Sequence, residues 1–189
     1  RCSKSHEYLF MFSKKPKYFY NQLFEKTKDG NNNKNMRSVW NINLKPKEKV
    51  VTISQWLLDG SLPTDELIVF AENARDTDKG TCIEAIEFAT RQKATIADDI
   101  LFTFVTNSLT ANAPRIKWES AKVIGNIAKV FPTKLIKPIH HLLTNAHDTG
   151  TVVRWASAWA LGEILKLRTK HNKELLPELE RLCKIEQDN

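Results

Sequence analysis

From residue 64 onward, apolar positions recur every three or four residues, the spacing of an amphipathic helix. Thr64 can cap the first of these helices, and Pro114 suits the first turn of a later one. A shorter helix is predicted to begin at Ser54 and to stop at Asp59 and Gly60. The pattern predicts helices over residues 65–74, 79–92, 96–110, 115–130, 134–146, 151–168 and 173–185.

One helical phrase occurs twice. Residues 117–127 are KWESAKVIGNI and residues 154–164 are RWASAWALGEI, 37 residues further along. A period of this size in helical units is typical of an α-solenoid, and it resembles HEAT-repeat proteins. The resemblance implies a mainly α fold, a HEAT-like solenoid of antiparallel helix pairs. The expected units are residues 79–112, 114–147 and 150–186, with residues 53–76 as an N-terminal cap.

Small and aromatic residues recur with this repeat. Gly125 and Gly162 lie in the middle of their predicted helices, where glycine is tolerated if a neighbouring helix approaches closely. Trp155 and Trp159 share a helix face, and Trp118 matches Trp155 in the repeat. We expect these tryptophans to fill the core or the space between repeats, with a base-stacking platform as the alternative.

The first 49 residues follow a different pattern. Residues 6–12, HEYLFMF, predict a buried strand, and Pro16 turns the chain after it. Residues 29–36 predict a loop, and residues 45–49 predict a linker. We therefore expect two domains: a short β or irregular segment with its linker over residues 1–49, and the helical repeats over residues 50–189.

The N-terminal segment resembles a known family. SHEYLFMFSKKPKYFYN, followed after a polar loop by MRSVWNINLKP, is similar to part of the amino-methyltransferases that modify adenine N6 or cytosine N4 in DNA. In that family the first phrase closes the central sheet and the second follows the target-recognition region. The resemblance covers about residues 1–46 and implies an association with DNA.

The chemical motifs of that family are absent from this sequence. The family grips the flipped base with an Asp/Asn/Ser-Pro-Pro-Tyr tetrad, and no two prolines are adjacent here. Its S-adenosylmethionine loop is rich in glycine, and no G-x-G occurs here. We therefore expect a fragment without catalytic or cofactor-binding residues, with S-adenosylmethionine implied only for a full-length relative.

Positive charge is concentrated at the start of the chain. Residues 1–50 contain 12 Lys/Arg and 4 Asp/Glu, whereas the remaining residues have a net charge of −1. Such a basic segment favours phosphate contact, with an aromatic side chain stacking on a base. The alternative is a set of solvated charges around a core tryptophan. The candidate DNA-binding residues are Lys14, Lys15, Lys17, Arg37, Trp40 and Lys45.

Other features restrict the location and chemistry. No apolar run is long enough to span a bilayer, and the odd number of widely spaced cysteines favours a reducing, cytoplasmic location. His140, His141 and His147 are better explained as surface or half-buried histidines than as metal ligands. Glu84 and Glu87 are expected on a solvated helix face, without a catalytic role.

Two alternatives concern the helical domain. Its slightly negative charge suits a scaffold that binds protein on a concave face, with no DNA role. A helical DNA glycosylase-like binder is the other alternative, because some such proteins hold duplex DNA in a basic groove. Its candidate groove cations are Lys117, Lys122, Lys129, Arg154 and Lys166.

Overall fold

The computed structural model describes residues 24–26, 32–35 and 46–187, and the chain divides into two units, Arg1–Asn41 and Ile42–Asn189. In the first unit, β1 (Phe24–Lys26) pairs antiparallel with β2 (Asn32–Asn35), and Phe24 lies opposite Asn35. The loop predicted over residues 29–36 was therefore wrong for residues 32–35. The strand predicted over residues 6–12 lies outside the described residues.

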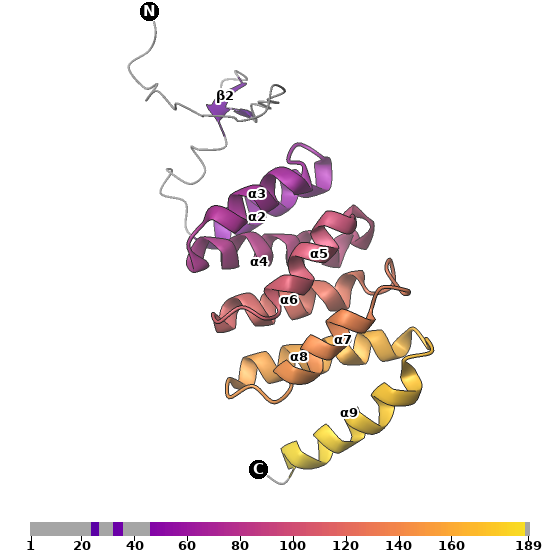
Figure 1. Cartoon of the computed structure of the whole chain (residues 1–189). Coiled ribbons are helices and arrows are strands. Elements are labelled where there is room, and N and C mark those ends of the chain that lie inside the picture. Colours follow the sequence, from indigo (N-terminus) through magenta and orange to yellow (C-terminus); the bar gives the residue numbers. More distant parts are fainter. Residues whose placement is uncertain (1–23, 27–31, 36–45, 188–189) are drawn as a thin grey trace, which may run out of the picture. The chain divides into compact units, whose positions relative to one another are not determined.

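The described residues of the second unit are mainly helical, so the prediction of a mainly α protein is confirmed (Figure 1). All seven helices predicted from residue 64 onward are present. Of the helices in the described part of the chain, none is both long and apolar enough to cross a membrane. The helices are α2 (Pro46–Asp59), α3 (Thr64–Asn73), α4 (Asp76–Gln92), the 3-10 helix η1 (Ala94–Ile96), α5 (Asp99–Ser108), α6 (Pro114–Ile127), α7 (Ile136–Asn145), α8 (Thr151–Lys166) and α9 (Asn172–Gln187).

Helix α2 begins earlier than the sequence pattern indicated. The linker predicted over residues 45–49 is wrong from Pro46 onward, because the helix starts there. Proline suits the first turn of a helix, since it lacks the backbone N–H that would have no partner there. Ser54 is consequently inside the helix, and its hydroxyl donates to the Val51 carbonyl at 2.8 Å. The charged residues after Pro46 lie in the solvent-exposed first turn, which explains their resemblance to a linker.

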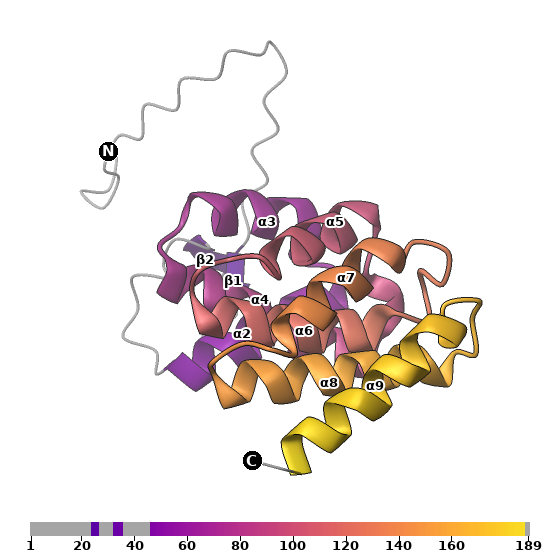
Figure 2. The ribbon, with the colours of Figure 1, turned by 60° about the horizontal axis from the view of Figure 1, so that its bottom comes forward.

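The helices of the second unit form two rows. Helices α2, α4, α6 and α8 pack in sequence against one another, and α3, α5 and α7 form a second row beside them (Figure 2). Each even-numbered helix from α4 to α8 also contacts a helix of the second row. The apolar core lies between the rows, and successive helix pairs add to it.

Several equivalent positions of the sequence repeat share the same burial. Five pairs of residues in α6 and α8, each 37 residues apart, are at most 1% exposed. Their shared burial shows that the repeated phrase encodes one packing surface used twice. The pairs are Ile116/Val153, Ser120/Ser157, Val123/Ala160, Ile124/Leu161 and Ile127/Ile164.

Polar side chains also connect successive helix pairs. The hydroxyl of Thr64 donates to Asp98 at 2.8 Å, whereas the N-cap of α3 is Pro63. Our assignment of Thr64 as the cap was therefore wrong, because its hydroxyl is used between helices. Asp98 caps α5 by accepting the Leu101 amide at 2.8 Å. Further along, the buried amide of Asn145 donates to the Leu109 carbonyl at 2.9 Å.

Candidate functional site

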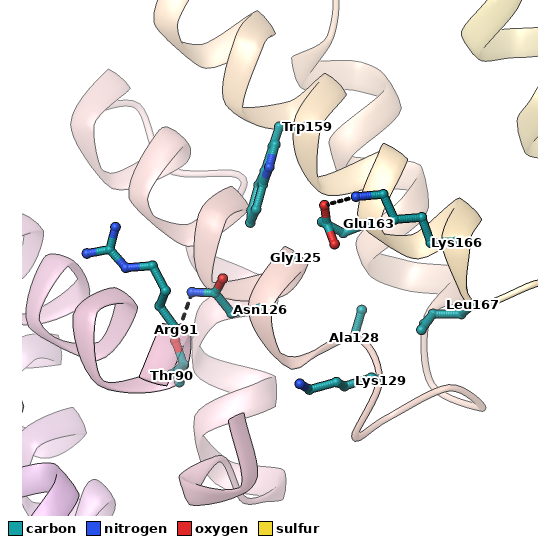
Figure 3. A pocket seen from close by; sticks show the side chains of 10 residues that line it. All are labelled: Thr90, Arg91, Gly125, Asn126, Ala128, Lys129, Trp159, Glu163, Lys166 and Leu167. Carbon is teal, nitrogen blue, oxygen red and sulfur yellow. Dashed lines mark hydrogen bonds and ion pairs between the residues drawn. The ribbon is translucent and has the colours of Figure 1, made fainter. Parts of the chain in front are cut away.

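A pocket of about 220 Å³ lies where the C-terminal ends of α4, α6 and α8 meet (Figure 3). Three helices supply its walls because they are consecutive members of one row. Helix α4 contributes residues 90 and 91, α6 and the turn after it contribute residues 125–129, and α8 contributes residues 159–167. The lining residues are Thr90, Arg91, Gly125, Asn126, Ala128, Lys129, Trp159, Glu163, Lys166 and Leu167.

One wall of the pocket is fixed by a glycine and a tryptophan. The ring of Trp159 reaches from α8 to α6 and lies against Gly125 (Figure 3). A Cβ on Gly125 would be only 2.4 Å from Cζ3 of Trp159, which no unstrained structure allows. The close approach that we predicted for Gly125 is therefore confirmed. The prediction was wrong for Gly162, where a Cβ would meet no atom within 4 Å.

The opposite wall is held by hydrogen bonds between α4 and α6. The side-chain amide of Asn126 donates to the Glu87 carbonyl at 3.2 Å and to the Thr90 hydroxyl at 3.3 Å. Thr90 in turn donates to the Ile86 carbonyl at 2.7 Å. This chain of bonds orients Asn126 and keeps its helix in register with α4.

Three cations surround the pocket. Lys166 pairs with Glu163 at 2.5 Å (Figure 3), and Arg91 lies 3.7 Å from the carboxylate of Glu87. Lys129 is exposed and makes no hydrogen bond or ion pair with any residue that the structure describes. The lining residues include one carboxylate, Glu163, and neither His nor Cys. This composition suits the binding of an anion better than acid–base chemistry.

Beside the pocket, two buried carboxylates share one lysine. Glu87 and Glu119 are 3% and 5% exposed, and the ammonium of Lys122 lies 3.8 Å and 2.8 Å from them. The indole of Trp118 donates to Glu119 at 2.8 Å. Buried charges require such partners, so this cluster joins α4 to α6. Our prediction that Glu87 is solvated was wrong. Its carboxylate is buried between α4 and α6, where Lys122 and Arg91 neutralise it.

The predicted groove cations do not all gather in one place. Lys129 and Lys166 line the pocket, but Lys117 forms an ion pair with Asp148 at 2.7 Å. Lys122 belongs to the buried cluster, and Arg154 donates to the Asp148 carbonyl at 3.2 Å. Arg91 was not among the predicted groove cations, all of which come from α6, the turn after it and α8. The signal that could have identified Arg91 is its position along the helix, because the pocket cations all lie within two residues of a helix C-terminus.

The tryptophans divide between packing and exposure. Trp118 and Trp159 are half-buried, but Trp155 is 61% exposed. The prediction that Trp155 fills the core was wrong, because α8 is the last helix of its row among the described residues.

For the histidines, no group of three or more potential metal ligands occurs in the part of the chain that the structure describes. There His147 instead lies 3.3 Å from Arg181.

The six candidate DNA-binding residues belong to the N-terminal part of the sequence. They lie outside the residues that the structure describes, so their arrangement stays a prediction. These residues are Lys14, Lys15, Lys17, Arg37, Trp40 and Lys45.

Comparison with known proteins identifies a methyltransferase-related segment. A stretch of 47 residues is 53% identical to the type II methyltransferase M.XycI of Xanthomonas campestris pv. cyanopsidis. The type II methyltransferase M.Cfr9I of Citrobacter freundii is 45% identical over a stretch of the same length. Each match covers 24% of this chain and only 16% of the relative. No protein-family profile and no solved structure matches the chain.

Proposed function

We propose that this chain is a DNA-associated fragment of a DNA amino-methyltransferase, joined to a HEAT-like repeat domain and not catalytic by itself. The observation that carries the proposal is the 47-residue match at 53% identity to a type II methyltransferase. The phrases at residues 5–21 and 36–46, which resemble the DNA amino-methyltransferases, account for a segment of about that length. The basic excess of residues 1–50 is consistent with contact to phosphate.

Methyl transfer would require parts that this sequence lacks. No Pro-Pro-Tyr tetrad and no G-x-G loop occurs in the 189 residues. The pocket at the ends of α4, α6 and α8 offers no substitute, because its charged groups are mainly cationic and S-adenosylmethionine carries a sulfonium cation. The residues therefore do not fit this cofactor. The tetrad and the loop would have to be supplied from outside these 189 residues to complete the enzyme.

The helical unit supports the HEAT-like part of the proposal. Its repeat of 37 residues is slightly shorter than the roughly 40–47 residues of HEAT-like units, and each unit likewise contains a pair of helices. Its helices form two rows in which each pair packs on the next, as expected for a solenoid.

A protein-interaction scaffold is the second candidate, and one observation favours it. Trp155 and Val152 of α8 are 61% and 50% exposed, one turn apart on the same helix. Exposed large apolar side chains that lie together are typical of interaction surfaces. The glycosylase-like alternative gains less support, because three of its five groove cations are engaged within the fold.

DNA association can be tested with full-length chain and labelled duplex. A variant with Lys14, Lys15 and Lys17 changed to Gln loses three predicted phosphate contacts. Its binding should weaken at least tenfold at low salt, and its salt dependence should fall by a slope of about 2 to 3. A matched control loses three charges from the helical unit, at Lys134, Lys137 and Lys184. Equal weakening of both variants would contradict a DNA-binding role for the N-terminal segment.

Catalysis is tested separately with tritiated S-adenosylmethionine and unmodified duplex DNA. The chain alone should transfer no methyl group above background. Addition of a polypeptide that carries the Pro-Pro-Tyr tetrad and the glycine-rich loop should restore transfer if the chain is a methyltransferase fragment. Transfer by the chain alone would show that it contains a complete active site.

A further inference from the structure

Positive charge gathers on the side of the helix row where the C-termini of α4, α6 and α8 lie. Helices α4, α6 and α8 each have exposed cations between one residue before and four residues after their C-terminus, and we call this set the basic edge. The net charge of −1 over residues 51–189 conceals this concentration, because acidic residues lie elsewhere, including the first turns of α3 and α4. The basic edge consists of Arg91, Lys93, Lys129, Lys166, Arg168 and Lys170.

Most of these cations are not neutralised within the fold. Lys93, Lys129, Arg168 and Lys170 have no side-chain hydrogen bond or ion pair with another residue of the described chain. Helix C-termini attract cations through the helix dipole, which explains a single charge at each end. It does not explain two or three at one end, because like charges repel. An anion bound across the edge would relieve that repulsion.

The pocket gives the edge a defined shape. Lys129, Lys166 and the ring of Trp159 all line it (Figure 3). The indole packs closely against Gly125, which fixes one side of the hollow. Cations around a preformed hollow are typical of a site for a compact polyanionic group such as a phosphate.

We propose that the basic edge binds the phosphodiester backbone of a nucleic acid, with one phosphate between Lys129 and Lys166. The other cations would contact neighbouring phosphates of the same strand. Packed helices are about 8–10 Å apart, so three helix ends present cations along roughly 20 Å. A polymer with a charge about every 3.4 Å of axis can meet all of them at once. The site goes beyond the proposed function, because it uses none of residues 1–46.

The test compares full-length variants in binding to a labelled 20-base-pair duplex. Lys129→Gln with Lys170→Gln should weaken binding about fivefold or more at 50 mM salt and lower the salt slope by about 2. The control, Lys134→Gln with Lys137→Gln, removes the same charge from the α7 side and should bind like the parent chain. Both pairs are exposed, so thermal unfolding should be nearly unchanged. Equal affinity of the edge variant and the control would overturn the proposal.

A variant that strengthens binding sharpens the test. Glu163→Gln removes the carboxylate that pairs with Lys166, so affinity for duplex should increase several-fold.

A competition assay tests which polyanion the edge prefers. Polyglutamate of equal charge should compete poorly with the labelled duplex. Competition as strong as that of unlabelled duplex would assign the edge to acidic peptides and overturn the proposal.

The outcomes separate the two nucleic-acid proposals. If only the Lys14, Lys15 and Lys17 variant binds weakly, the N-terminal segment binds DNA and the basic edge does not. If only the Lys129 and Lys170 variant binds weakly, the edge carries the contact and DNA association by the N-terminal segment is wrong.

Discussion

The indole of Trp159 on α8 lies directly against Gly125 on α6. A Cβ on Gly125 would lie 2.4 Å from Cζ3 and 2.9 Å from Cη2 of the ring. Gly125 does not have a positive φ, so the backbone conformation does not require glycine here. Glycine is required because the ring of Trp159 approaches so closely. Gly162 occupies the equivalent position of the repeat on α8, and no atom lies within 4 Å of the space where its Cβ would be.

We predict opposite effects of alanine at these two glycines. Alanine favours a helix interior by about 1 kcal/mol over glycine, and Gly162→Ala should therefore stabilise the protein by about 0.5–1 kcal/mol. At Gly125 the clash with a rigid ring outweighs that gain, because overpacking costs roughly 1–3 kcal/mol or more. Gly125→Ala should lower the free energy of unfolding by about 1–2 kcal/mol, measured by urea denaturation. Stabilisation by both substitutions would show that Trp159 moves away freely.

These two glycines also show how far the sequence could predict the fold. Periodicity and capping signals located the helices from residue 64 within about three residues, because each helix has its own apolar stripe. The repeat alone placed Gly125 with Gly162 and Trp118 with Trp155 as equivalents. It could not show that the row ends at α8 among the described residues, where the outer face has no next helix. For this reason Gly162 faces nothing and Trp155 is exposed.

The candidate pocket was only partly predictable for a related reason. Lys129 and Lys166 were candidate groove cations because they lie in the helices predicted for the repeat. Lys117 and Lys122 were candidates for the same reason. Their roles differ because each has a carboxylate from another element nearby: Asp148 for Lys117, and Glu87 of α4, in addition to Glu119 of its own helix, for Lys122. The pairings between elements depend on how the helices stack, and no local pattern encodes them.

We expect Asn145 to be a stability determinant between repeats. Its side chain is 5% exposed, and its amide donates to the Leu109 carbonyl at 2.9 Å. Asn145→Ala removes that bond and leaves the carbonyl without this donor, which costs about 1–3 kcal/mol. The control is Asn107→Ala, where an exposed amide oxygen accepts from Lys137 at 2.8 Å; its effect should stay within about 0.5 kcal/mol. Equal thermal unfolding of both variants would contradict the expectation.

Thiol labelling should distinguish two cysteines. Cys82 is fully buried, and burial, with a smaller contribution from the nearby charge of Asp78, raises the pKa of its thiol to about 12. Only about one molecule in ten thousand would be a thiolate at pH 8. Cys183 is exposed. Iodoacetamide should therefore modify Cys183 at least a hundredfold faster than Cys82, as measured by mass spectrometry of peptides. The difference should disappear in denaturant, and equal rates in the native protein would indicate local opening of α4.

The ion pair between Lys117 and Asp148 should make stability depend on pH. The hydrogen bond from Lys117, together with one from the Gly150 amide, holds the pKa of the Asp148 carboxyl below its ordinary value of 3.8. Because the folded-state pKa is the lower one, the carboxylate stabilises the fold above about pH 5, and the contribution is lost as the pH falls through the folded-state pKa.

Asp148→Asn should therefore cost about 0.5–1 kcal/mol at pH 7. The gap between variant and parent should stay constant down to about pH 5 and narrow below pH 3.8, in urea denaturation at each pH. Asparagine can still accept the Gly150 amide, so the substitution mainly isolates the pair with Lys117. Glu180→Gln, at an exposed position, is the matched control and should show no such gap. A gap that stays the same between pH 7 and pH 3 would mean that the charge of Asp148 contributes nothing to stability.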